Sequence, residues 1–207
     1  FDFNALYHPD FDEVVRENAR KEIYKTIRYL LDQQLPLNHL LKSDFVIIND
    51  VLADFYKIPN VEGPHFRKVS LSKHHPRGGL LGTAAIHIMG SDGQRSSPVE
   101  RGSWVLRYLL NDPPPPAPAN VPMLSRFEEE VLSARELQKA HQEQPQCAQC
   151  HQKIDPIGYG LENFTAAGIW RDEEVIIKTN TEKKKKRSKS SIAIHKFPIN
   201  PSGMLPR

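Results

Sequence analysis

The sequence predicts a mostly α-helical fold. We expect the tail of a helical domain, then a small helical segment around a pair of cysteines, with Gly- and Pro-rich irregular connections. Apolar residues recur at steps of three and four in several segments, which is the spacing of one helix face. Of the 207 residues, 39% are hydrophobic and 17 are proline. No run approaches the roughly 18 apolar residues that cross a bilayer, so we expect no membrane-spanning segment.

The first 62 residues predict two helices, and the family resemblance described below implies that they form the C-terminal part of a helical domain. One helix runs from Asp10 to about Gln33, and the other from about Asp44 to Tyr56. The second helix ends before a proline, because the residue that precedes proline avoids helical geometry. The apolar stripe of the first helix comprises Phe11, Val14, Val15, Ala19, Ile23, Ile27, Leu30 and Leu31.

Residues 63–122 are rich in Gly, Ser and Pro and predict one helix and one extended arm. Ser97 is expected to cap a helix that starts at Pro98 and stops near Asn111. Four consecutive prolines from Pro113 favour polyproline II geometry, so we interpret this arm as a stiff spacer.

Residues 123–172 predict a helix from about Leu124 to Gln142, followed by a compact cysteine motif. Cys147-Ala-Gln-Cys150-His151 matches the Cys-x-x-Cys-His pattern that attaches a c-type haem. Two thiols three positions apart can form thioethers to the two vinyl groups of one porphyrin, and the adjacent imidazole can reach the iron. We therefore expect one covalent haem, with Cys147 and Cys150 as attachment thiols and His151 as the proximal iron ligand.

The surroundings of the motif favour the same interpretation. A backbone carbonyl in the turn after Pro156 is expected to accept the second imidazole N–H of His151, since metal-bound histidines are generally oriented in this way. Apolar residues that can keep water off a porphyrin follow the motif: Ile154, Ile157, Leu161, Phe164 and Trp170.

Two other uses of the cysteines stay open. They are the only cysteines in the chain, which excludes a Cys₄ or Cys₃His zinc site and an iron–sulfur cluster. A zinc site could still form from both thiols and two of His141, His151 and His195. A thioredoxin-like redox pair is disfavoured, because no βαβ pattern surrounds the motif.

The sixth iron position has several candidates. Electron-transfer cytochromes commonly place Met there. Met204 is our candidate for this distal ligand because it lies C-terminal to the motif in a Pro-flanked segment; Met89, Met123, His141 and His195 compete with it.

The segment from Cys150 to Arg171 reads Cys-His-Gln-Lys-Ile-Asp-Pro-Ile-Gly-Tyr-Gly-Leu-Glu-Asn-Phe-Thr-Ala-Ala-Gly-Ile-Trp-Arg. Upstream lie Arg77-Gly-Gly-Leu-Leu-Gly, Arg95-Ser-Ser-Pro-Val-Glu-Arg-Gly-Ser-Trp-Val-Leu and an Asn-Asp-Pro-Pro-Pro-Pro run. In this order, over about residues 60 to 175, the chain resembles large bacterial proteins built from planctomycete-specific, cytochrome-c-associated domains.

The resemblance implies a cytochrome-c-like haem segment that transfers electrons within a larger exported protein, periplasmic or secreted. Its partners would be an unidentified redox protein and the remaining domains. The alternative is a structural zinc-binding or accessory module of a secreted carbohydrate-processing protein. No paired acidic site identifies glycosidase chemistry, so the carbohydrate-processing alternative rests on the resemblance alone. We expect an electron carrier or redox accessory domain rather than a catalytic domain.

Residues 173–207 are interpreted as a lysine-rich insertion and the start of a truncated C-terminal domain. Six positive charges lie between Lys183 and Lys189, and without them the net charge of +3 would become negative. No aromatic residues are interleaved for bases to stack on, so we expect no nucleic-acid partner. The run is interpreted as a solvated insertion between two strands or turns.

Overall fold

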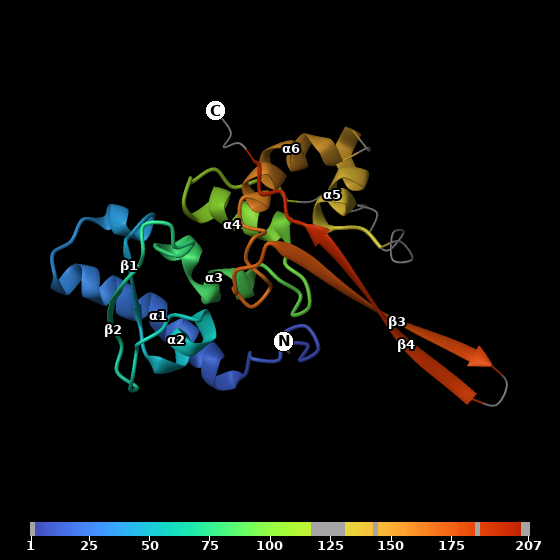
Figure 1. The fold of residues 1–207 in the computed structure, drawn as a ribbon. Coiled ribbons are helices and arrows are strands. Elements are labelled where there is room, and N and C mark those ends of the chain that lie inside the picture. Colours follow the sequence, from blue (N-terminus) through green and yellow to red (C-terminus); the bar gives the residue numbers. More distant parts are fainter. Residues whose placement is uncertain (1–2, 117–130, 143–144, 185–186, 204–207) are drawn as a thin grey trace. The chain divides into compact units, whose positions relative to one another are not determined.

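The computed structural model describes residues 3–116, 131–142, 145–184 and 187–203 (Figure 1). Within them the chain forms six α-helices and two antiparallel sheets of two strands each. The fold is therefore mixed α/β, and the expectation of a mostly α fold is wrong. The chain divides into two compact units: Phe1–Arg101 with Phe164–Trp170, and Gly102–Asn163 with Arg171–Arg207.

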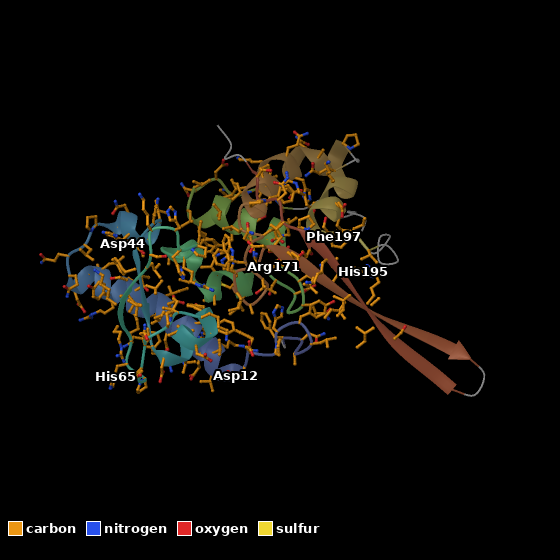
Figure 2. All side chains as sticks on the ribbon, in the orientation of Figure 1. Asp12, Asp44, His65, Arg171, His195 and Phe197 are labelled. Atoms are coloured by element: carbon orange, nitrogen blue, oxygen red, sulfur yellow. The ribbon has the colours of Figure 1, made fainter. Side chains whose placement is uncertain are left out.

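The long helix of the first unit agrees with the prediction. Helix α1 spans Glu13–Asp32, and the carboxylate of Asp12 caps it by accepting a hydrogen bond from the backbone N–H of Val15 at 2.8 Å. Figure 2 shows Asp12 at this end of the helix. An aspartate at this position satisfies one of the N–H groups that a helix start leaves without a partner.

The prediction of a second helix from about Asp44 to Tyr56 is wrong for its first half. Residues Phe45–Ile48 form strand β1, and only Asp50–Tyr56 form a helix, α2. The side chain of Asn49 accepts from the N–H of Leu52 at 3.2 Å and so begins the helix there. Strand β1 pairs antiparallel with β2, Arg67–Ser70.

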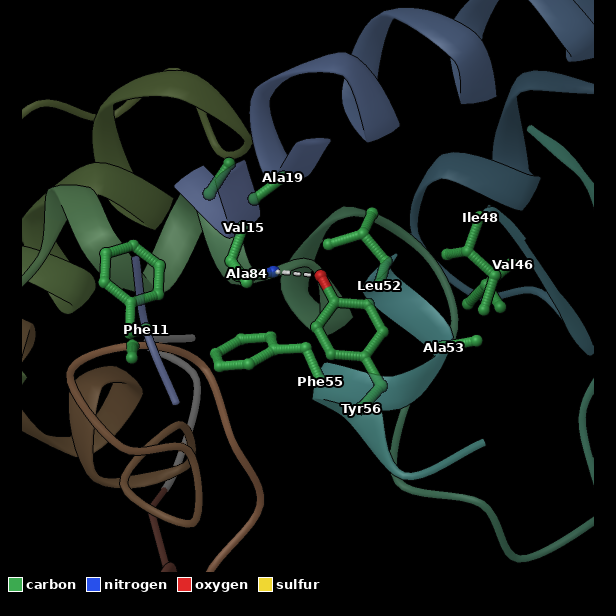
Figure 3. Close-up of a cluster of buried hydrophobic side chains, with 12 residues drawn as sticks. Phe11, Val15, Ala19, Val46, Ile48, Leu52, Ala53, Phe55, Tyr56 and Ala84 are labelled. Atoms are coloured by element: carbon green, nitrogen blue, oxygen red, sulfur yellow. Dashed lines mark hydrogen bonds between the residues drawn. The ribbon is translucent and has the colours of Figure 1, made fainter. Parts of the chain in front are cut away.

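Strand β1 is buried on both faces, which explains its uninterrupted apolar sequence. Val46 and Ile48 belong to the main core of the unit, whereas Phe45 and Ile47 pack with Leu30 of α1 in a second cluster. Figure 3 shows the main core. It comprises Phe11, Val15, Ala19, Val46, Ile48, Leu52, Ala53, Phe55, Tyr56, Ala84, Ala85 and Ala167.

A polar group lies within this core. The hydroxyl of Tyr56 donates to Oε2 of Glu22 at 2.6 Å and accepts from the N–H of Ala84 at 3.0 Å, the contact drawn in Figure 3. Ala84 begins helix α3, Ala84–Met89. Two short 3₁₀ turns, Leu37–Leu40 and Leu80–Gly82, complete the regular elements of this unit apart from the start of α4.

Helix α4, Pro98–Tyr108, starts in the first unit and continues into the second. It confirms the helix predicted from Pro98, and the hydroxyl of Ser97 accepts from the N–H of Glu100 at 3.3 Å, as expected of a cap. Residues 113–116 form neither helix nor strand. The rest of the proline-rich arm, and the predicted start of the next helix at Leu124, lie outside the described residues.

The second unit contains helices α5, Ala134–Gln142, and α6, Pro145–Tyr159, and a long hairpin. Strand β3, Glu173–Lys184, pairs antiparallel with β4, Arg187–Pro198. The lysine-rich stretch therefore lies largely in this hairpin, which is one reason that the chain contains more strand than its sequence predicted. No described helix is both long and apolar enough to cross a membrane.

Candidate haem attachment site

A single helix carries the three residues of the predicted site. Cys147, Cys150 and His151 lie on α6, at positions separated by three and four residues, so they share one helix face. Cys147 is buried and Cys150 is half-buried, and neither forms a disulfide. The two thiols and the imidazole that a covalent c-type haem requires are thus presented side by side.

The sequence of α6 explains where the helix starts and stops. Pro145 occupies its first position, where the missing N–H is not needed. Pro156 lies inside the helix and cannot donate to the preceding turn, and the helix ends three residues later at Tyr159, before Gly160. The motif therefore lies in the regular part of the helix, ahead of the proline.

A carboxylate orients the imidazole of His151. Its Nδ1 lies 2.9 Å from Oδ1 of Asp155, four residues along the helix, and Asp155 has no exposed surface. Because a carboxylate only accepts, Nδ1 carries the proton in this contact. The expected acceptor was a backbone carbonyl; the structure provides a charged side chain instead. The i, i+4 spacing of the two residues on a helix is a signal that could have identified it.

A second side chain contacts the carboxylate of Asp155. The Nε2 atom of Gln142, at the end of α5, donates to Oδ2 at 2.7 Å. The pKa of the nearby Tyr159 is raised to about 12, first by burial and then by the negative charge of Asp155. The guanidinium of Arg135 lies over the Tyr159 ring, 4.3 Å from its centroid. The buried carboxylate is therefore held by donors from two helices.

The apolar residues expected around the site fall into both units. Ile154, Ile157 and Leu161 are buried in the second unit, together with Cys147. Phe164 and Trp170 belong to the first unit, where their rings meet edge to face at 5.2 Å. Phe164 also stacks on the fully buried ring of His87, with centroids 4.3 Å apart.

The structure gives two arginines of the upstream motifs a role that sequence reasoning missed. Arg77 donates to the carbonyl oxygens of Gly82 at 2.7 Å and Gly168 at 2.6 Å. Arg101 donates to those of Phe164 at 2.8 Å and Thr165 at 2.7 Å. Both arginines are buried, and they anchor residues 164–170 within the first unit. Nothing in the sequence distinguishes such buried arginines from exposed ones.

The remaining residues predicted as zinc ligands or as the distal iron ligand are histidines and methionines outside the motif. His195 lies on β4, opposite Ile176 of β3, and is labelled in Figure 2. The side chain of His141 is not described, and Met123 and Met204 lie outside the described residues. Met89 is 57% exposed at the end of α3. Among the described residues, no group of three or more His, Cys, Asp and Glu side chains is arranged to hold a metal ion.

Two regions of the chain match family models. Residues 77–174 match the model described as PSCyt3, a protein of unknown function (DUF1588). Residues 2–58 match the model described as PSD4, a protein of unknown function (DUF1592). Both are planctomycete cytochrome-c-associated domains, so the chain is similar to two such domains in succession. The first match includes α6 and both buried arginines.

No curated protein and no solved structure matches the chain.

Proposed function

We propose that this chain is a haem c-binding electron-transfer module of a larger exported bacterial protein. Cys147 and Cys150 would hold one haem covalently, and His151 would bind its iron. The observation that carries the proposal is the placement of both thiols and the oriented imidazole on one face of α6. The cytochrome-c-associated names of the matched domains support it.

The residues present fit such a group. The two thiols are three positions apart and do not form a disulfide with each other. The hydrogen bond at Nδ1 orients the imidazole of His151, so Nε2 would be the nitrogen that binds iron. Ile154 and Ile157, from the same helix, are buried and contribute apolar surface that excludes water. The bound haem would supply one-electron redox chemistry; the chain supplies attachment, orientation and a dry environment.

The proposal extends to location and partners. Thioether attachment of haem takes place outside the cytoplasm in bacteria, so the protein would be periplasmic or secreted, as the resemblance implies. Its partners would be a redox protein and the other domains of the full-length protein. Met204 is retained as the proposed distal ligand. A Met-to-iron charge-transfer band should then disappear in Met204→Ala and persist in Met89→Ala; a band that survives Met204→Ala rules this ligand out.

The test is spectroscopic, on protein produced with a haem-maturation system in an export-competent host. We expect a Soret band, sharp α and β bands on reduction, and haem that survives denaturing gel electrophoresis. Cys147→Ala and Cys150→Ala should each weaken covalent retention, and the double variant should abolish it. His151→Ala should keep the haem attached but change the spectrum.

His195→Ala is the matched control, because it removes another histidine of the same unit. Under the haem proposal with Met204 as the distal ligand, it leaves attachment and spectrum unchanged. Under the zinc alternative with His195 as a ligand, it would reduce the bound zinc, as Cys147→Ala would. Stoichiometric zinc without haem in protein from this host contradicts the proposal.

A further inference from the structure

We propose that Asp155 is a positioning residue that lowers the reduction potential of the haem through its hydrogen bond to His151. This inference rests on the proposed function, because it concerns the iron ligand named there. It assigns a role to a residue that touches neither the porphyrin nor the iron in our account.

The geometry singles out this carboxylate. Asp155 is completely buried, and its Oδ1 lies 2.9 Å from Nδ1 of His151. Gln142 donates to the other oxygen at 2.7 Å. Burying a carboxylate is costly unless it is paired and hydrogen-bonded. The carboxylate is held here by two donors, one of which is the proposed iron ligand.

The charge has a direct consequence for the iron ligand. A carboxylate that accepts the Nδ1 proton draws that proton away from the ring and increases the electron donation of Nε2. Stronger donation and the nearby negative charge both favour the more positive ferric state over the ferrous state. A neutral backbone carbonyl at the same place would lack the charge. The haem held by His151 should therefore have a lower potential than one oriented by a carbonyl.

The other donor acts in the opposite direction. Gln142 withdraws electron density from the carboxylate that His151 also uses. Removing this donor leaves more negative charge on Oδ1 and strengthens the contact to Nδ1. The network thus predicts shifts of opposite sign for the carboxylate and for its supporting donor.

The experiment is potentiometric titration of the haem-loaded full chain. Asp155→Asn should raise the midpoint potential by about 59 mV or more, which corresponds to a tenfold change in the one-electron equilibrium. Gln142→Leu should lower it, because it removes the donor to Oδ2. Glu174→Gln is the matched control, because Glu174 is another buried carboxylate of the same unit and accepts from the N–H of Ala134 instead of from His151. It should shift the potential little.

The outcomes separate the two proposals. The haem content of the wild-type chain is measured first. A wild-type chain without haem would contradict both the proposed function and this inference. With haem fully loaded, an unchanged potential in Asp155→Asn, or an equal rise in Glu174→Gln, overturns the inference and leaves haem attachment standing. If Asp155→Asn fails to fold, Gln142→Leu decides: a lowered potential supports the role of Asp155, and an unchanged or raised potential contradicts it.

Discussion

The guanidinium of Arg101 donates to the carbonyl oxygen of Phe164, a residue 63 positions away in the sequence, at 2.8 Å. The same guanidinium reaches Thr165 at 2.7 Å, so one buried side chain of α4 satisfies two consecutive carbonyls. Phe164 is the last residue of the Leu-Glu-Asn-Phe block that follows the cysteine motif. It therefore belongs to the first unit.

Replacing Arg101 by Ala should lower the free energy of unfolding by about 3–5 kcal/mol, because two buried carbonyls lose charged donors and a cavity remains. Chemical denaturation measures the change. Arg107→Ala, which removes an exposed arginine of the same helix, should change stability by no more than about 0.5 kcal/mol. Equal effects of the two substitutions would contradict this role.

Replacing Gly102 by Ala should also destabilise the chain. A Cβ atom at Gly102 would lie 2.2 Å from the carbonyl oxygen of Ile154, so α4 and α6 would have to separate. We expect a net loss of about 1–3 kcal/mol, the usual cost of overpacking. Gly160→Ala is the comparison, because its nearest contact would be 3.3 Å, and it should cost less. A stable Gly102→Ala variant would mean that the two helices do not approach this closely.

Stability should depend on pH through Glu22. Burial raises the pKa of Glu22 from 4.5 to about 7 in the folded state. The folded chain therefore binds this proton more tightly than the unfolded chain, and its contribution is complete below pH 4.5 and lost as the pH rises through 7. The loss amounts to about 3 kcal/mol. Denaturation of the wild type and Glu22→Gln at several pH values isolates it, since the amide that replaces the carboxyl group does not titrate.

The difference in unfolding free energy between the wild type and Glu22→Gln should fall as the pH rises from about 4.5 to about 7, between the unfolded and folded pKa values, and level off above that. A difference that stays constant or increases would show that Glu22 is already ionised in the folded state.

Deleting Lys183 to Lys189 should leave folding and the haem spectrum unchanged. The register pairs Asn180 with Ser191, so the deletion leaves three residues to connect the shortened strands, a common hairpin loop length. The thermal midpoint and the spectrum measure the outcome. Replacing the same residues by Gly and Ser is the control that keeps the length. Loss of salt-sensitive binding to an acidic partner in both variants would assign the run a function.

The sequence predicted the helices whose apolar spacing or capping is unambiguous. Helices α1 and α4 lie where the stripe from Phe11 and the Ser97-Pro98 cap placed them. Strand β1 was missed because a short run of apolar residues fits a buried strand and a helix equally well. Only packing on both faces, against Leu30 on one side and the main core on the other, makes it a strand.

The candidate site was predictable only in part, because some of its contacts are local in the sequence and others depend on packing. The spacing of Cys147, Cys150 and His151 is local, and it places them on one helix. Asp155 is local too, four residues from His151, but Gln142 is not, because its contact depends on how α5 packs against α6. The arginine contacts to residues 164–170 connect distant segments, so they could be found only in the folded chain.

Covalent attachment of one haem can be measured in the intact mass of the denatured protein. Protein produced with a haem-maturation system should carry the mass of one haem on every chain. The double variant Cys147→Ala with Cys150→Ala should have the mass of the polypeptide alone. A wild-type chain of unmodified mass, produced in a host that attaches haem to a control cytochrome in the same preparation, would rule out covalent attachment.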